Sequence, residues 1–176
     1  CINFDRDGFL KRKNLPTDCQ LISSIGELRT LKRHDDLIRA AAIVTREFHN
    51  AHFVIAGVDT SPSGENLKQL KELSVELKLQ GHIHFLGWLD DAEQLLCATD
   101  VFVSASETES FGLSIVEAMS ARTAVVATRM EGAQEIIEDQ VTGMLVPIGD
   151  VERLASSITA LLKDQEKRTT MGTQAG

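Results

Sequence analysis

The sequence lacks several features that would place it in other protein classes. No apolar run approaches the roughly 18 residues that a membrane-spanning helix needs, and no secretory signal is visible. The three cysteines, Cys1, Cys19 and Cys97, are widely spaced and form no CxxC pair for zinc or redox chemistry. There is also no basic excess, since the formal net charge is −8. We therefore expect a cytoplasmic protein with incidental or small buried thiols and no nucleic-acid partner.

Length and composition predict one soluble domain. The chain has 176 residues, of which 43% are apolar and 25% are charged, close to the average for globular proteins. No internal repeat, low-complexity segment or linker divides it. We predict a single domain over residues 1–176, with residues 1–18 as a polar, turn-rich lead. Because the first residue is Cys rather than Met, we expect the sequence to be a piece of a longer protein.

Short apolar runs alternate with longer amphipathic stretches along the chain, which is the pattern of a parallel sheet wrapped by helices. The predicted strands are Cys19 to Ile25, His52 to Ala56, Ile83 to Leu86, Val101 to Ala105, Thr123 to Ala127 and Met144 to Val146. Each is apolar nearly throughout, as expected of strands that are covered on both faces.

Helical periodicity fills the segments between these strands. Apolar side chains share one face of a helix at Leu37, Ala41, Val44 and Phe48, and again at Leu67, Leu70, Ser74 and Leu77. Asp150 precedes a third apolar stripe as its expected N-cap. The fold class is therefore α/β, a doubly wound, Rossmann-like parallel sheet, whose ligand we expect at the carboxyl ends of the strands.

The segment after the Val101 to Ala105 strand is the best candidate for a ligand site. Polar residues from Ser106 to Ser110 are followed by an apolar helix, predicted over Phe111 to Ala121, with Gly112 in its first turn. Glycine there costs roughly 1 kcal/mol relative to alanine unless a ligand needs close approach to the backbone. The first N–H groups of this helix, those of Phe111, Gly112 and Leu113, are suited to bind a phosphate.

Two glutamates flank the start of this predicted helix. Glu117 stands eight residues after Glu109, in a segment that is apolar on almost every side. A carboxylate in such surroundings needs partners, and vicinal sugar hydroxyls can satisfy both of its oxygens. The alternative is that Glu117 lies on an exposed helix edge and that Glu109 is only a polar turn residue.

Residues Glu109 to Met119 resemble the E-x7-E signature of the family-4 retaining glycosyltransferases. The neighbouring segments that match in order are Ser24 to Ile38, His84 to Leu89 (HFLGWL), Ser104, Val125 to Ala127, Gly132 to Ile137 (GAQEII), Thr142 to Val146 (TGMLV) and Asp150 onward. The resemblance covers about Leu21 to Met171, which is most of the chain. It implies the C-terminal, nucleotide-sugar-binding half of a GT-B enzyme, without the N-terminal acceptor-binding domain.

The resemblance also implies roles for individual residues. Glu117 would bind the nucleotide ribose and Glu109 would lie against the donor sugar as the catalytic residue. The amides of Phe111, Gly112 and Leu113 would hold the diphosphate together with Lys32, and the region of Gly87 and Trp88 would approach the base. No metal or other cofactor is implied. The acceptor, a glycan, lipid or small molecule, and any peripheral membrane contact would belong to the missing domain, so we expect the isolated piece to be inactive.

One departure from the family pattern concerns charge. In the loop Gly26 to Lys32, Glu27 stands where the family has a phosphate-binding arginine. A unit charge about 5.5 Å from a phosphate is worth on the order of 3 kcal/mol at an effective dielectric constant near 20, so the reversal is unfavourable. Arg29, two residues along an extended segment, could take over the role, and so could Arg33. A degenerate enzyme is the third possibility.

Two further departures concern the backbone. Arg122 and Ala124 stand where the family usually has Gly and Pro, which is expected to alter a turn. Met130 and Glu131 precede Gly132 where a second glycine is common, which leaves the choice of donor open.

Other interpretations of the sequence are weaker. Asp5, Arg6 and Asp7 form a D-x-D triplet, which is expected to be a solvated turn rather than a metal site. His82 and His84 would project to one side of a strand, but two ligands do not make a metal site. The acidic run Glu135 to Asp139 is expected to be a helix end. No G-x-G-x-x-G follows the first strand, which argues against a dehydrogenase. A non-catalytic nucleotide-sugar-binding or interaction module remains the alternative function.

Overall fold

All six predicted strands form, and they make one parallel sheet. The computed structural model describes residues 4–109 and 111–175. The strands are β1 (Gln20–Ile25), β2 (Ala51–Ala56), β3 (Ile83–Gly87), β4 (Val101–Ser104), β5 (Ala124–Thr128) and β6 (Met144–Val146). Their order across the sheet is β3-β2-β1-β4-β5-β6, and every neighbouring pair is parallel. This confirms the doubly wound, Rossmann-like α/β fold.

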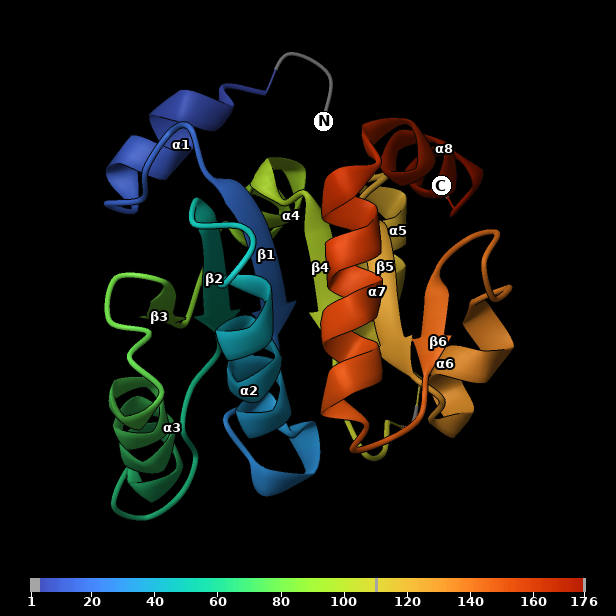
Figure 1. Cartoon of the computed structure of the whole chain (residues 1–176). Helices are drawn as coiled ribbons and strands as arrows, with labels where there is room; N and C mark the ends of the chain where they lie inside the picture. Colours follow the sequence, from blue (N-terminus) through green and yellow to red (C-terminus); the bar gives the residue numbers. More distant parts are fainter. Residues whose placement is uncertain (1–3, 110, 176) are drawn as a thin grey trace.

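Helices cover both faces of the sheet (Figure 1). One face packs against α2 (His34–Val44), α3 (Glu65–Glu76) and α7 (Val151–Lys163). The other packs against α1 (Arg6–Arg12), α4 (Ala92–Ala98), α5 (Leu113–Ser120) and α6 (Glu131–Ile136). Within the described residues, none of these helices, nor α8 (Gln165–Ala175), is suited by length and apolarity to span a membrane.

The predicted helix faces form, with one boundary corrected. Leu37, Ala41 and Val44 are buried on α2, but Phe48 lies beyond the end of that helix and packs against the core from the following turn. Asp150 is the N-cap of α7, where its Oδ1 accepts a hydrogen bond of 2.9 Å from the Arg153 N–H. The acidic run from Glu135 does mark a helix end, since α6 stops at Ile136.

The polar lead that we predicted is wrong, because residues Arg6–Arg12 form helix α1. Asp5 caps this helix by accepting a hydrogen bond of 2.9 Å from the Gly8 N–H. Its apolar pair, Phe9 and Leu10, is fully buried against α4 and the sheet. The D-x-D triplet is therefore a helix start rather than a solvated turn. This helix is short and buries only two adjacent apolar residues, so its sequence does not show the helical repeat of apolar positions.

The turn before β5 contains one departure from the family pattern, Arg122 in place of glycine. Arg122 has a φ of 60°, a left-handed conformation that is most easily adopted by glycine. This is the position where the family usually has glycine. The expected altered turn therefore keeps a backbone that glycine prefers but carries a side chain.

Asp100, just before β4, joins the first and last helices at the amino-terminal end of the sheet. Its Oδ2 accepts hydrogen bonds from the Leu21 N–H at 2.8 Å and from Arg6 Nη2 of α1 at 3.0 Å. Its Oδ1 lies 3.6 Å from Arg168 Nη2 of α8. Figure 1 shows α1 and α8 at this end of the molecule, opposite the tips of the strand arrows. The carboxyl ends of the strands are therefore left to other segments.

We expect Asp100→Asn to lower the free energy of unfolding by about 1 to 3 kcal/mol, because the amide keeps the size of the carboxylate but loses its charged hydrogen bond to Arg6 and its ion pair with Arg168. Urea denaturation measures this change. Glu76→Gln, on the exposed side of α3, is the matched control. Equal stability of the two variants would mean that the Asp100 contacts do not hold the helices together.

Candidate functional site

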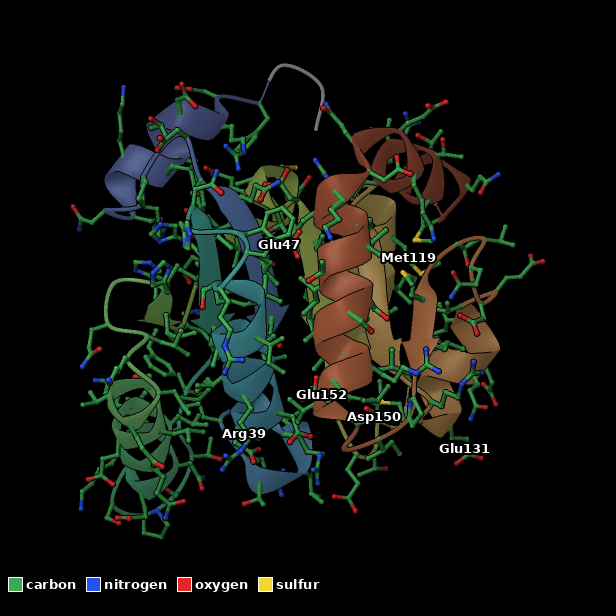
Figure 2. All side chains as sticks on the ribbon, viewed as in Figure 1. Arg39, Glu47, Met119, Glu131, Asp150 and Glu152 are labelled. Carbon is green, nitrogen blue, oxygen red and sulfur yellow. The ribbon has the colours of Figure 1, made fainter. Side chains whose placement is uncertain are left out.

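The strand order creates a crevice between β1 and β4. Connections run in opposite directions from these two central strands, so the loops that follow them separate at their carboxyl ends. The backbone pairing of β1 with β4 is short, with Ile22 opposite Val101 and Ser23 opposite Phe102, whereas β1 pairs with β2 along its whole length. Figure 2 shows Asp150 and Glu131, which begin α7 and α6, at this same end of the molecule, and Glu47 and Met119 further from it.

An ion pair joins the two loops across this crevice. Lys32 ends η1 (Thr30–Lys32), the short 3-10 helix after β1, and its Nζ contacts Glu109 Oε1 from the loop after β4. Ser106 Oγ donates to the same carboxylate oxygen at 2.9 Å. The Glu107 N–H also donates to the Leu31 carbonyl at 2.8 Å, so the backbones of the two loops are joined as well. A cation and a carboxylate predicted from distant parts of the sequence thus lie together.

The helix after β4 begins later than we predicted. It starts at Leu113, and Gly112 is its N-cap with a φ of 74°, so the prediction that Phe111 and Gly112 lie within the helix is wrong. This left-handed backbone is the physical reason for glycine at this position. No side chain among the described residues caps this helix, which leaves its first N–H groups open. Phe111 and Leu113 are exposed, and Ser110 lies outside the described residues.

Glu117 lies on the exposed edge of α5 rather than among apolar side chains. It lines a pocket of about 390 Å³ between α4 and α5, whose other lining residues are Ala92, Glu93, Leu96, Val116, Ser120 and Ala121. The position fits the exposed-edge alternative, and the pocket gives the carboxylate a place to meet a ligand.

Gly87 and Trp88 lie at the end of β3, just before the segment that leads into α4. Gly87 has a φ of 65°, and Trp88 is 71% exposed. The indole N–H donates to Asp90 Oδ1 at 2.9 Å. A large aromatic face is therefore held at the carboxyl end of the sheet, on the side from which α4 begins.

Among the described residues, Arg29 makes its ion pair with Glu27 and not with Glu109. Arg29 Nη1 lies 3.5 Å from Glu27 Oε2, and both side chains are about half exposed. They line a shallow pocket together with Thr60, Ser61 and Asn66 from the β2–α3 segment. The charge that departs from the family pattern is thus partly neutralised by its neighbour.

Comparison with known proteins identifies the family of the chain. Residues 5–176 match the family described as glycosyl transferases group 1. The chain belongs to this family. It is 34% identical over 154 residues to the lipopolysaccharide core biosynthesis glycosyltransferase LpsE of Rhizobium meliloti, covering 88% of this chain and 43% of that protein. It is 31% identical over 156 residues to N-acetyl-alpha-D-glucosaminyl L-malate synthase of Bacillus anthracis, covering 89% and 39%. This glycosyl transferase chain spans less than half the length of these relatives.

Solved structures give the same assignment. The chain superposes on Anabaena HepE in complex with UDP with a TM-score of 0.93 and 27% identity, covering 99% of this chain and 47% of that one. On the C-terminal domain of the glycosyl transferase group 1 protein LpcC of Francisella tularensis, the TM-score is 0.86 at 26% identity, covering 97% and 89%. The predicted fold, the C-terminal domain of a GT-B glycosyl transferase, is confirmed.

Three histidines of this glycosyl transferase domain, His52, His82 and His84, form a cluster. From the sequence, we predicted only His82 and His84 on one side of a strand. His52 of β2 joins His84 through a hydrogen bond of 2.9 Å between Nδ1 and Nε2, and His82 Nδ1 lies 3.0 Å from the Ala51 carbonyl. Burial, and then the neighbouring His52, lowers the pKa of His84 to about 4. Among the described residues, no group of three His, Cys, Asp or Glu side chains is placed to hold a metal ion.

His34 was missed as a site residue, whereas Arg33 was named as a possible substitute for the family arginine. His34, at the start of α2, is buried, and its Nε2 lies 3.3 Å from the Glu27 carbonyl. Arg33 has a φ of 49°, and its Nε donates to Asp36 Oδ2 at 2.7 Å. That hydrogen bond is the main cause that raises the pKa of Arg33. With its charge engaged by Asp36, Arg33 is a poor replacement for the missing family arginine. No sequence pattern indicates either the His34–Glu27 or the Arg33–Asp36 contact.

We expect the stability of the domain to fall as the pH is lowered from 6.5 to 4, in part because of His34. Burial, against the opposing effect of the Glu27 carbonyl, lowers the pKa of His34 to about 4. The unfolded chain, with a pKa near 6.5, therefore binds more protons in this window, which costs about 3 kcal/mol by pH 4. Above pH 7 this contribution is complete.

Thermal melting of the parent and of His34→Gln between pH 4 and pH 7.5 measures this effect. The variant should show a shallower slope, but not a flat one, since His84 titrates in the same direction. An identical slope in both proteins would mean that His34 is not held neutral by the fold.

Proposed function

We propose that this domain binds a nucleoside diphosphate sugar as the donor half of a family-4 retaining glycosyltransferase. The intact enzyme would transfer the sugar to an acceptor hydroxyl without a bound metal. The observation that carries the proposal is the crevice between β1 and β4, where Lys32 and Glu109 meet beside the N-terminus of α5, which no described side chain caps. A cation, a carboxylate and open peptide N–H groups converge at the point where this fold binds ligands.

The diphosphate would lie between Lys32 and the start of α5. Lys32 pairs with Glu109, and the two side chains are only 24% and 16% exposed. A diphosphate brings more negative charge than one carboxylate, so it can recruit the Lys32 ammonium while the first N–H groups of α5 bind further oxygens.

The nucleoside would lie over the groove between α4 and α5. Glu117 lines this groove and is suited to accept hydrogen bonds from both ribose hydroxyls. Trp88, exposed at the end of β3, offers an aromatic surface for the base. Ribose and base would thus be recognised by two elements on one side of the diphosphate.

Glu109 would lie against the donor sugar. Once a diphosphate draws Lys32 away, this carboxylate is free to accept hydrogen bonds from sugar hydroxyls, with Ser106 holding its orientation. Charge that develops on the leaving diphosphate would be stabilised by Lys32 and the fixed dipoles of α5, which is an electrostatic form of catalysis. This is the sense in which Glu109 would be catalytic.

Similar proteins support this assignment of the ligand. Structures of Anabaena HepE, 27% identical to this chain, contain UDP and UDP-glucose. These are therefore the first ligands to test, with GDP as the alternative nucleotide.

The acceptor would be bound by another part of a longer protein, since the chain spans less than half of its relatives. A set of exposed apolar side chains lies at the carboxyl edge of the sheet, as expected of a surface that another domain covers: Leu31, Val58, Trp88, Phe111, Leu113 and Ile148. We therefore expect this chain alone to bind the donor but not to transfer sugar. A non-catalytic nucleotide-sugar-binding module is the second candidate, favoured by Glu27, and donor turnover by the longer protein would exclude it.

The two glutamates should have separable effects. Glu117→Gln should weaken UDP and UDP-glucose alike, by about tenfold or more, because a charged acceptor to the ribose is lost from every ligand that carries it. Glu109→Gln should lower the affinity for UDP-glucose. It should leave the affinity for UDP unchanged or raise it, since Lys32 is released from its partner. Calorimetric titration of both ligands into each variant measures this.

Melting curves of both variants serve as the control for folding. If Glu117→Gln binds UDP like the parent, or if Glu109→Gln loses both ligands equally, the assignment of ribose and sugar roles is wrong. If the parent binds neither UDP nor GDP nor their sugar derivatives, the proposed function itself fails.

The two candidate phosphate ligands can be compared in the same way. Lys32→Ala should weaken UDP by about tenfold or more and leave uridine unchanged, because only the diphosphate loses its cation. Arg29→Ala weakens UDP to a similar extent only if Arg29 leaves Glu27 and replaces the family arginine. If Arg29→Ala binds UDP with unchanged affinity, Arg29 does not contact the diphosphate. If Lys32→Ala binds UDP with unchanged affinity, the diphosphate does not lie in this crevice.

A further inference from the structure

The peptide N–H of Glu27 is an open donor in the crevice between β1 and β4. Within the described residues it donates to no acceptor, although the two N–H groups beside it are both used. Gly26 donates to the Ala56 carbonyl and Leu28 to the Val58 carbonyl, each at 2.9 Å. A single unused N–H between two used ones is a specific feature of this loop.

The direction of this N–H follows from the geometry of an extended chain. In a parallel sheet, the backbone N–H and C=O groups of alternate residues point to opposite neighbouring strands. Gly26 and Leu28 point toward β2, so Glu27 points toward β4. Leu21, an odd-numbered residue of the same strand, points the same way, since its carbonyl accepts from the Asp100 N–H at 2.8 Å. The Glu27 N–H therefore faces the loop that carries Ser106 and Glu109.

The peptide groups on both sides of Glu27 are held in place. In the group that carries the Glu27 N–H, a Cβ at Gly57 would lie 1.9 Å from the Gly26 carbonyl oxygen, so only glycine allows the two loops to approach this closely. In the next group, the Glu27 carbonyl accepts from the Arg29 N–H at 2.9 Å, and the buried His34 imidazole places Nε2 3.3 Å from the same oxygen. Because His34 is buried and neutral at pH 7, it can donate Nε2–H to this carbonyl in one tautomer.

We propose that the Glu27 peptide N–H donates a hydrogen bond to the diphosphate of the donor, and that His34 is a positioning residue that aims it through the Glu27 carbonyl. The inference rests on the proposed function and adds a backbone donor to that site. It also accounts for the charge reversal at this position. The Glu27 side chain pairs with Arg29 and lines the pocket beside Thr60 and Ser61, on the β2 side, whereas its N–H faces β4.

Proline at position 27 tests the donor directly. Glu27→Pro removes the N–H without breaking any hydrogen bond among the described residues. Glu27→Ala is the matched control, because it removes the same side chain and keeps the N–H. In calorimetry, Glu27→Pro should weaken UDP by about tenfold or more relative to Glu27→Ala, while uridine, which lacks the diphosphate, binds both equally. Equal UDP affinity in the two variants overturns the proposal.

A second pair of variants tests His34 and remains decisive if the proline variant does not fold. His34→Leu keeps a buried side chain of similar size but removes the imidazole contact with the Glu27 carbonyl, whereas His34→Gln retains a side-chain N–H donor. We expect His34→Leu to lose UDP affinity several-fold without change in uridine affinity, and His34→Gln to restore it. If uridine weakens as much as UDP, or if glutamine gives no rescue, His34 is only structural and the positioning role is overturned.

The parent chain separates this inference from the proposed function. If the parent binds UDP or GDP and the position-27 variants do not differ, the backbone donor is wrong and the nucleotide site stands. If the parent binds no nucleoside diphosphate, the proposed function fails, and the inference fails with it.

Discussion

The reversal of strand order between β1 and β4, two parallel neighbours whose connections leave in opposite directions, is the constraint on which the rest of the site depends. Because successive connections leave these strands in opposite directions, no helix crosses the gap between their carboxyl ends. Two loops that are about 75 residues apart in sequence must meet there, and they do so through the Lys32–Glu109 ion pair and the Glu107–Leu31 backbone hydrogen bond. Charge and open backbone groups are concentrated at the one place where the sheet cannot bury them.

Backbone geometry shapes the candidate site alongside its side chains. Gly112 ends the β4 loop in a left-handed conformation, which sets where α5 begins. Gly57 permits the close approach that fixes the loop after β1. If the donor binds to peptide groups as we propose, a change of side chain such as glutamate for arginine at position 27 would matter less, because every residue except proline supplies the same N–H.

The sheet could be predicted from the sequence, whereas parts of the site could not. Buried parallel strands such as β4 and β5 are continuous apolar runs, and such runs are recognisable without tertiary information. Helix α1 was missed because only Phe9 and Leu10 face the core, so its period is too short to detect. The contact of His34 with the Glu27 carbonyl depends on how a loop folds back onto a helix, and no spacing in the sequence encodes it. The roles of Glu109 and Glu117 remain predictions based on family resemblance.

The ion pair between Lys32 and Glu109 has a consequence for any anion that binds at this lysine. The anion must replace a carboxylate that the fold already holds against the ammonium, so the lysine exchanges one negative partner for another. If the diphosphate binds there as proposed, its affinity is the difference between two attractions to one cation rather than the strength of a single contact. Such an exchange limits how tightly the released product can be held.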